Sequence, residues 1–225
     1  MADFKEVTAK VYKDQAVFFL NAFWPETGEK EAEKIWGNYH LVCELDVENG
    51  AEGCKLDEFQ AHRFFEKEGY ALGVVEMRQK LNVQDPKFKK IAFIEFLLYK
   101  YNQTIAELMK RPQGTNEELV KAQKAMSDVQ GEIKKIEEKK AELEKKAAEG
   151  TGVAAMRANN ELQQLLSSDK TELNRALVTA EAAVRKAQKA GGENNVAPGA
   201  LWWMGRELEE AKKYKPQKKG GVPKK

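Results

Sequence analysis

Residues 115–150, which read TNEELVKAQKAMSDVQGEIKKIEEKKAELEKKAAEG, decide the fold of this chain. Apolar residues recur in the stretch at alternating steps of three and four residues, and glutamate and lysine fill the flanks. This a/d heptad spacing is typical of a long helix that packs along a partner helix. The seam consists of Leu119, Ala122, Met126, Val129, Ile133, Ile136, Leu143 and Ala147, and only Lys140 interrupts it.

Both ends of this predicted helix carry the usual signals. Thr115-Asn-Glu-Glu118 is a capping box, in which a hydroxyl and a carboxylate satisfy backbone donors at a helix start. Gly150-Thr-Gly152 is a C-cap. A second helix is expected from about Ala154 to Leu166, and a third runs from a capping box at residues 169–172 to the glycine pair at 191–192.

The partner of the heptad seam has two possible sources. The long helix could pack back on the later helices of its own chain as a hairpin, or two chains could form a parallel dimeric coiled coil. The seam lasts only about four heptads and a second amphipathic helix follows closely, which favours the hairpin. In both cases residues 113–225 form an elongated, charged helical domain that ends in a Lys-rich tail.

Residues 1–112 differ, because they hold most of the aromatic side chains. Their apolar residues have helical spacing, as in Val17, Leu20 and Trp24, and few alternate with period two. We therefore expect a compact all-α domain. Pro112 and Gly114 break the helical pattern and place the domain boundary near residue 112.

A repeat inside the first domain predicts a pair of EF-hands. Cys54-Lys-Leu-Asp-Glu58-Phe recurs as Ile91-Ala-Phe-Ile-Glu95-Phe about 37 residues later. Both strings resemble the end of an EF-hand loop that enters its exit helix. A working loop needs oxygen ligands at positions 1, 3 and 5, glycine at 6 and a bidentate glutamate at 12.

The second loop fails this requirement. Counting back from Glu95 places Gln84, Pro86 and Phe88 at positions 1, 3 and 5, and Lys89 where glycine belongs. Phenylalanine and proline offer no ligand and the lysine repels a cation, so only the glutamate remains. This hand is not expected to bind calcium.

The first loop is also out of register. Counting back from Glu58 places Val47, Asn49 and Ala51 at the ligand positions, whereas an expanded loop that starts at Asp46 could hold calcium weakly. The candidate metal ligands are therefore Asp46, Glu58 and Glu95, as weak or lost calcium sites. The favoured interpretation is a degenerate EF-hand pair kept as a scaffold, in which the two glutamates are acids at helix N-termini.

Composition excludes several function classes. The 225 residues are 33% charged, and 38 basic against 36 acidic side chains leave a net charge of only +2, which argues against nucleic acid as a partner. No apolar run is long enough to cross a bilayer, so no membrane partner is expected. The two histidines have no nucleophile placed beside them, and no catalytic or cofactor motif has its required context, so an enzyme is not expected.

Several strings together resemble one family, the calcium-regulated actin-bundling proteins known from amoebae. They are QAVFFLNAFW at residues 15–24, FIEFLLYKY at 93–101, ALVTAEAAVR at 176–185 and GALWWMGRELEE at 199–210. The resemblance covers nearly the whole chain in the same order. It implies an EF-hand pair followed by a helical F-actin-bundling C-terminal domain, in agreement with the two halves inferred from the residues.

The resemblance also implies where a filament would bind. The main actin-binding surface of the family maps to about residues 121–183, and calcium acts through the EF-hands to weaken bundling. The candidate filament-binding residues are Lys121, Lys124, Lys134, Lys135, Lys139, Lys140 and Arg175, together with Lys218 and Lys219 of the tail. Because the second loop lacks its acidic ligands, calcium control is expected to be weak or lost.

Ciliary relatives of this family exist as structural proteins inside the doublet microtubules of axonemes. The lost calcium ligands and the basic C-terminus, which could meet the acidic surface of tubulin, favour such a role here. The first expectation is therefore a non-enzymatic architectural component of ciliary doublet microtubules, in the cytoskeleton of a cilium or flagellum, with tubulin and neighbouring axonemal proteins as partners. The alternative is a cytoplasmic F-actin-binding and bundling protein.

The aromatic end of the chain allows two interpretations. Trp202 and Trp203, which precede a lysine-rich tail, could insert into a partner as binding anchors, or they could dock the last helix onto the bundle. Docking is favoured, with the tail lysines as the contact surface.

Overall fold

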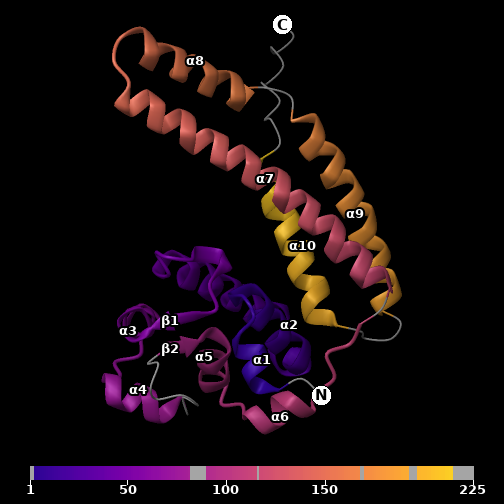
Figure 1. The fold of residues 1–225 in the computed structure, drawn as a ribbon. Coiled ribbons are helices and arrows are strands. Elements are labelled where there is room, and N and C mark those ends of the chain that lie inside the picture. The colour runs from indigo at the N-terminus through magenta and orange to yellow at the C-terminus, as the bar shows by residue number, and fades with distance from the viewer. Residues whose placement is uncertain (1–2, 82–89, 116, 168–169, 193–196, 215–225) are drawn as a thin grey trace, which may run out of the picture. The chain divides into compact units, whose positions relative to one another are not determined.

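The computed structural model describes residues 3–81, 90–115, 117–167, 170–192 and 197–214. Helices dominate these residues, with two three-residue strands beside them, so the predicted all-α class is confirmed (Figure 1). The chain forms two compact units. The first contains residues up to Gly114 together with described residues 197–202, and the second contains the remaining helices.

The first unit is built from short helices around one long helix. Its elements are α1 (Phe4–Thr8), α2 (Tyr12–Leu45), a 3-10 turn η1 (Gly50–Glu52), β1 (Lys55–Asp57), α3 (Glu58–Lys67), α4 (Val74–Lys80), β2 (Lys90–Ala92), α5 (Phe93–Lys100) and α6 (Ile105–Lys110). The helix α2 is interrupted, because Phe23 and Gly28 have non-helical backbone angles around Pro25. Gly28 has φ +59°, which glycine adopts without steric cost.

Aromatic rings form the core of this unit. Phe96 is 1% exposed, and its ring centroid lies 4.6 Å from that of Phe64 and 5.1 Å from that of Phe65, both in edge-to-face geometry. Tyr70 and Phe93 extend the same cluster. Edge-to-face pairs of this kind add to the free energy gained from burial alone, so this cluster holds α3 and α5 together.

The two loops of the predicted EF-hand pair meet in a short antiparallel ladder. Lys55 pairs with Ala92, Leu56 with Ile91 and Asp57 with Lys90. A helix precedes β1, and a helix follows each strand, at the sequence positions of the repeat. The ladder therefore joins the ends of the two predicted loops.

The start of α10 (Pro198–Lys212) belongs to the first unit. The amide of Ala200 donates a hydrogen bond of 2.8 Å to the side-chain oxygen of Asn21, which caps the first turn of this helix. Gly199 lies directly on α2, since a Cβ there would fall 2.5 Å from the Cβ of Leu20. Trp202 lies edge-on to Trp36, with centroids 6.4 Å apart.

The second unit consists of α7 (Glu117–Glu149), α8 (Val153–Ser167), α9 (Thr171–Gly192) and the rest of α10 from Trp203. In Figure 1, α8 folds back along the C-terminal half of α7, and α9 runs beside its N-terminal half. These bounds match the three predicted helices. The capping boxes predicted for the starts of α7 and α9 each include a residue outside the described part, Asn116 in the first and Asp169 in the second.

The turn between α7 and α8 requires its two glycines. A Cβ on Gly150 would lie 2.6 Å from the carbonyl oxygen of Lys146, and Gly152 has φ +58°. This supports the predicted C-cap at residues 150–152. Among the described residues, no helix is both long and apolar enough to span a membrane.

Candidate functional site

The heptad seam of α7 is used within its own chain. Leu119, Ala122, Met126 and Val129 are buried in the N-terminal half. The matching face of α9 buries Leu173, Leu177, Ala180, Val184 and Ala187. Alanine in both seams allows the two backbones to approach closely, so the packing is that of an intramolecular hairpin, the alternative that the sequence favoured over a dimer.

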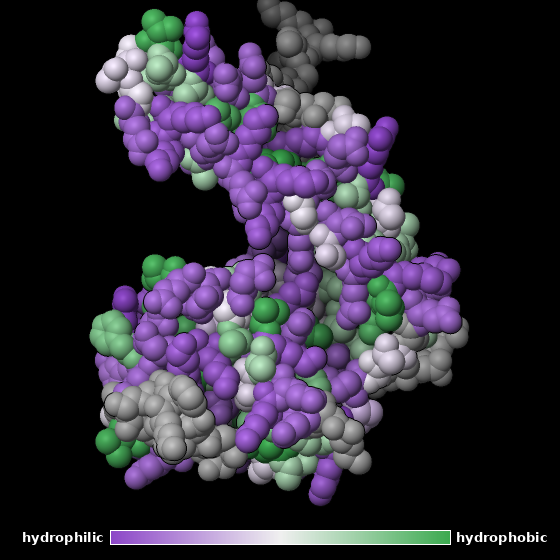
Figure 2. Space-filling model, viewed as in Figure 1, coloured by the Kyte–Doolittle hydropathy of each residue, from purple (hydrophilic) through white to green (hydrophobic). Residues whose placement is uncertain are grey.

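The C-terminal half of α7 has a much thinner core. Leu143 is buried at 4% exposure and Ala158 of α8 at 6%, whereas Ile136, Ala147 and Leu162 are only half-buried. Lys140, which interrupts the seam, is exposed. Two helices alone cannot surround their apolar side chains, so much of the hairpin surface is open to a partner. Figure 2 shows that this surface is mostly hydrophilic in the view drawn.

The second part of α10 completes the bundle of α7 and α9. Trp203 is fully buried, and Met204, Leu208 and Ala211 are buried as well. Polar contacts hold its edges: Gln130 donates to Glu207 over 2.9 Å, and Lys212 lies 3.3 Å from Glu181. Trp203 is thus buried in the bundle, and Trp202 is half-buried against Trp36, as the docking interpretation expects.

Four of the predicted filament-binding cations form ion pairs within the second unit. Lys121 lies 3.0 Å from Glu118, Lys135 lies 2.6 Å from Glu132, Lys140 lies 3.6 Å from Glu144 and Arg175 lies 3.4 Å from Glu172. The hydrogen bonds in the first two pairs raise the pKa of Lys121 and of Lys135. All four cations are exposed, so these pairs contribute little to stability and remain available for exchange with a partner.

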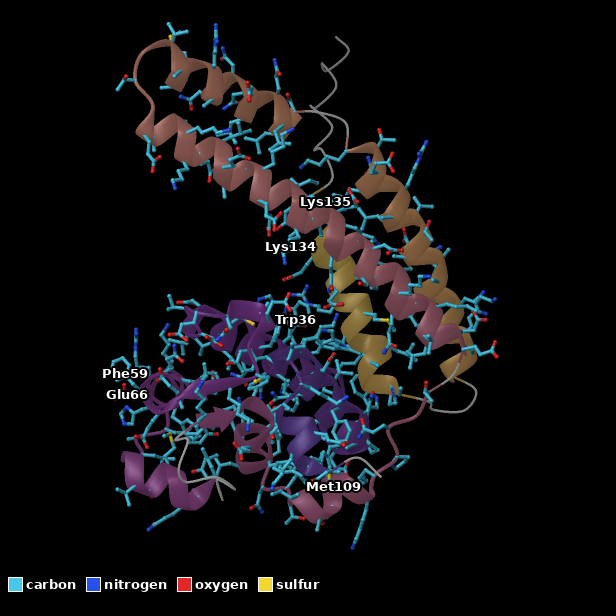
Figure 3. All side chains as sticks on the ribbon, in the orientation of Figure 1. Trp36, Phe59, Glu66, Met109, Lys134 and Lys135 are labelled. Atoms are coloured by element: carbon cyan, nitrogen blue, oxygen red, sulfur yellow. The ribbon has the colours of Figure 1, made fainter. Side chains whose placement is uncertain are left out.

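Three other predicted cations behave differently. Lys124, Lys134 and Lys139 are exposed along α7, and none of them has an ion pair or hydrogen bond with any residue in the described ranges. Figure 3 labels Lys134 beside Lys135 at the middle of this helix. Lys139 attracts Glu142 electrostatically, whereas Lys124 and Lys134 have no ion pair or hydrogen bond to lose when a partner carboxylate approaches. The remaining two predicted cations, Lys218 and Lys219, lie outside the described residues.

A shallow groove between α7 and α9 brings two of the predicted cations together. It has a volume of about 410 Å³. Lys135 of α7 and Arg175 of α9 both line it, and Glu172 acts on Lys135 electrostatically across the two helices. The other lining residues are Ala125, Ser127, Asp128, Gly131, Glu132, Ala176 and Thr179.

The sequence alone did not identify the glutamates that form ion pairs with these cations. Glu118 binds Lys121 on its own helix and also Lys186 of α9, at 3.1 Å, and both contacts lower the pKa of Glu118. The pairs within one helix have a signal in the sequence, since they lie three or four residues apart. The contact to Lys186 has none, because it depends on how α7 and α9 are aligned.

The candidate calcium ligand Asp46 is engaged in internal contacts. It is 3% exposed, accepts a hydrogen bond of 2.8 Å from the hydroxyl of Tyr12, and accepts another of 3.1 Å from the amide of Asn49. Gly53 packs against the same carboxylate, since a Cβ there would lie 2.1 Å from the Asp46 oxygen. Burial and the bond to Asp46 raise the pKa of Tyr12.

The other two candidate ligands lie in the first turns of helices, the position expected for helix N-terminal acids. Glu58 is the first residue of α3, and Glu95 is in the first turn of α5. Glu95 is buried and accepts a hydrogen bond of 2.8 Å from the amide of Ala92. Burial raises the pKa of Glu95 to about 7, and a carboxyl that is uncharged for part of the neutral range is a poor calcium ligand.

Within the described residues, no three His, Cys, Asp or Glu side chains are grouped so that they could hold a metal ion. A glutamine instead joins the two hands. The side-chain amide of Gln15 donates to the carbonyl of Cys54 over 2.7 Å, and its oxygen accepts from the amide of Ile94 over 2.9 Å. Gln15 therefore links the residue before β1 to the first turn of α5.

Comparison with known proteins agrees with the two-part architecture. The sequence model described as "F actin bundling C terminal" matches residues 90–219, which is more than half of the chain. The chain belongs to the F-actin-bundling family. It is similar to the "Calcium-regulated actin-bundling protein" of Dictyostelium discoideum, with 34% identity over 97% of this chain and 90% of that protein.

A solved structure shows the same relationship. The crystal structure of the 34 kDa F-actin bundling protein from Dictyostelium discoideum matches with a TM-score of 0.80 and 34% identity, over 96% of each chain. Members of this family are structural proteins of the cytoskeleton, which confirms the prediction of a non-enzymatic protein. The comparisons favour the F-actin alternative, and they offer no support for the ciliary role that the sequence placed first.

Proposed function

We propose that this protein binds and bundles actin filaments through the second unit, and that its calcium control is weak or lost. The observation that carries the proposal is the family match at residues 90–219, which contains the whole of α7, α8 and α9. Those helices present the exposed lysines of α7. The partner is F-actin, and this activity would place the protein in the actin cytoskeleton of the cytoplasm.

The state of the two hands supports the second part of the proposal. Asp46 is buried against Tyr12, Glu95 is buried in the first turn of α5, and Gln15 contacts both Cys54 and Ile94. In the second loop the sequence has Gln84, Pro86, Phe88 and Lys89 where ligands and a glycine are required, and these four residues lie outside the described part. The pair is therefore assigned a scaffolding role.

Co-sedimentation of the purified full chain with F-actin tests the proposal. High-speed pelleting measures binding, low-speed pelleting measures bundling, and each is run with calcium and with a chelator. The proposal expects pelleting at both speeds with no difference between the two conditions. Failure to pellet at either speed would contradict filament binding, and a large calcium effect would contradict the loss of control.

A parallel series with microtubules separates the two filaments. The role inside ciliary doublet microtubules rested on the basic C-terminus and the lost calcium ligands, and tubulin would then be the partner. Pelleting with microtubules but not with F-actin would favour that role over the proposal. Pelleting with F-actin alone would support the proposal.

A further inference from the structure

The helix α8 carries very little charge on its outer face. Of its 15 residues only Arg157 and Glu161 are charged, whereas glutamate and lysine fill the exposed positions of α7. The other exposed side chains of α8 include apolar groups and carboxamides, namely Val153, Met156, Asn160, Gln163 and Gln164. Charged residues are depleted at the centres of protein interfaces, so this face has the composition of a surface that a protein partner covers.

The uncharged face lies on the side of α8 that points away from the hairpin. Among the described elements, α8 packs extensively only against α7 (Figure 1). Ala158 is buried and Leu162 half-buried on the inner side. Asn160 is two residues from each of them, which is about 200° around a helix, so it lies on the opposite side. Met156 and Gln163, four residues before Asn160 and three after it, share its face.

The carboxamides of this face are not used within the chain. Asn160, Gln163 and Gln164 form no side-chain hydrogen bond with any residue in the described ranges. Each carboxamide has both donor hydrogens and an acceptor oxygen, so it can pair with a copy of itself, which a charged group cannot do. The face therefore suits a two-fold interface, in which the same patch lies on both sides.

The order of residues along α8 also fits such a pair. Asn160 is the middle residue of Val153–Ser167, so in an antiparallel pair of α8 helices with full overlap the two Asn160 side chains meet at the two-fold axis. Arg157 and Glu161 are four residues apart and lie on one flank of the helix. In the antiparallel pair each arginine then lies within one helical turn of the glutamate of the other copy. The only two charges of α8 are thus complementary to those of a second copy.

We propose that the outer face of α8 is a self-association surface, on which a second copy of this chain packs its own α8 in the antiparallel direction. The candidate filament-binding residues lie on α7, on α9 and in the tail, so the pair leaves them outside the contact. A bundling protein must hold two filaments at once, and two joined copies supply two filament-binding units. This role of the dimer rests on the proposed function, whereas the self-association itself does not.

The size of the face sets how strongly the copies associate. A helix of 15 residues is about 22 Å long, and one face of it offers less area than a permanent dimer buries. The copies are therefore expected to associate weakly and reversibly in solution. Copies bound along neighbouring filaments are held at a high local concentration, which favours pairing between the filaments.

Charges placed at the middle of α8 test the self-association. Asn160→Glu and Asn160→Lys each bring two like charges together at the axis, so each variant alone should self-associate about tenfold more weakly than wild type. A one-to-one mixture of the two brings opposite charges together and should restore association. Sedimentation velocity of the full chains over a concentration series, without F-actin, provides the measurement. Gln123→Glu, at an exposed carboxamide of α7, is the control and should associate like wild type.

Low-speed pelleting with F-actin then tests what the dimer does. Each Asn160 variant alone should bundle less than wild type, and their mixture should recover bundling. Wild type that stays monomeric at every concentration would overturn this inference alone, as would a mixture that associates no better than either variant. An equal loss of association in Gln123→Glu would overturn it as well. Wild type that dimerises but fails to pellet with F-actin at high speed would overturn the proposed function and leave the self-association standing.

Discussion

The two units bury different kinds of side chain, and the difference separates scaffold from surface. In the first unit, the rings of Phe64, Phe65 and Phe96 pack within 6.3 Å of one another, centroid to centroid, at 2% exposure or less. In the second unit, the α7–α8 hairpin buries little more than Leu143 and Ala158. Closely packed rings hold a fixed geometry, whereas long charged helices leave most of their area accessible. Stability and partner contact are thus assigned to different parts of the chain.

The largest effect is expected in the aromatic cluster. Phe96→Ala should lower the free energy of unfolding of the first unit by about 3–5 kcal/mol, because it removes a buried ring and leaves a cavity. Chemical denaturation followed by near-ultraviolet circular dichroism measures this loss. Phe59→Ala is the matched control, since Phe59 is 71% exposed and its removal should cost less than about 0.5 kcal/mol. Similar losses in both variants would contradict the comparison.

A smaller effect is expected at the hairpin. Leu143→Ala should cost about 2 kcal/mol, near the lower end for such changes, because the half-buried surroundings can relax into the space. The loss should be confined to α8 and the C-terminal half of α7, where amide hydrogen exchange would accelerate. Leu166→Ala, at a side chain that is 46% exposed, is the control. Faster exchange throughout α9 would show that the hairpin is not a separate region of low stability.

Glu95 links the scaffold to pH. Its pKa of about 7 in the folded protein lies above the ordinary value of 4.5, so the unfolded chain loses this proton first as pH rises. The contribution of Glu95 to the free energy of unfolding is fully present below about pH 4.5. It is lost as the pH rises from there to about 7. Glu95→Gln should therefore stabilise the protein at pH 8 by about 1–2 kcal/mol and change little at pH 4.

Denaturant melts of Glu95→Gln and wild type at pH 4 and pH 8 provide the measurement. The expected gain in the free energy of unfolding is smaller than the whole pKa difference would give. The reason is that a neutral amide accepts the hydrogen bond from Ala92 less strongly than a carboxylate does. Equal stability of the two proteins at pH 8 would contradict the burial of an ionised Glu95. Glu58→Gln, at the equivalent position of the first hand, serves as the comparison.

The smallest effect is expected at the break in the heptad seam. Lys140→Ala should change the free energy of unfolding by less than about 0.5 kcal/mol, because the side chain is exposed and its pair with Glu144 is open to solvent. Thermal melts are sufficient to measure it. A large destabilisation would mean that Lys140 packs into the hairpin. The two units would then differ less in how many side chains they bury.

Local patterns predicted much of this fold. The spacing of Leu119, Met126 and Val129 located α7 and its buried face, and the glycines at 150 and 152 marked its end. Helix periodicity and backbone conformation are set by neighbours in the sequence, so they can be read from it. The repeat around Glu58 and Glu95 likewise located the paired strands β1 and β2 and the helices α3 and α5 that follow them.

Contacts between distant residues had no such signal. Asn21 caps a helix that starts 177 residues later, at Pro198, and Gly199 packs on Leu20. Neither Asn21 nor Gly199 is unusual in its own segment, so nothing in the local sequence indicates these contacts. The same limit applies to the candidate site: Lys135 and Arg175 were each proposed from the resemblance, but their common groove depends on the alignment of α7 with α9.

Charge reversal tests most directly whether the filament contact belongs to the second unit and not to the first. Lys124→Glu, Lys134→Glu and Lys139→Glu are combined in one variant, and Lys5→Glu, Lys30→Glu and Lys110→Glu, all at exposed positions of the first unit, are combined in a control with the same net charge. Affinity for F-actin is then measured by co-sedimentation. The first variant should lose about tenfold or more, and the control should stay close to wild type. Equal losses, or wild-type binding by the first variant, would contradict the assignment of the filament contact to the second unit.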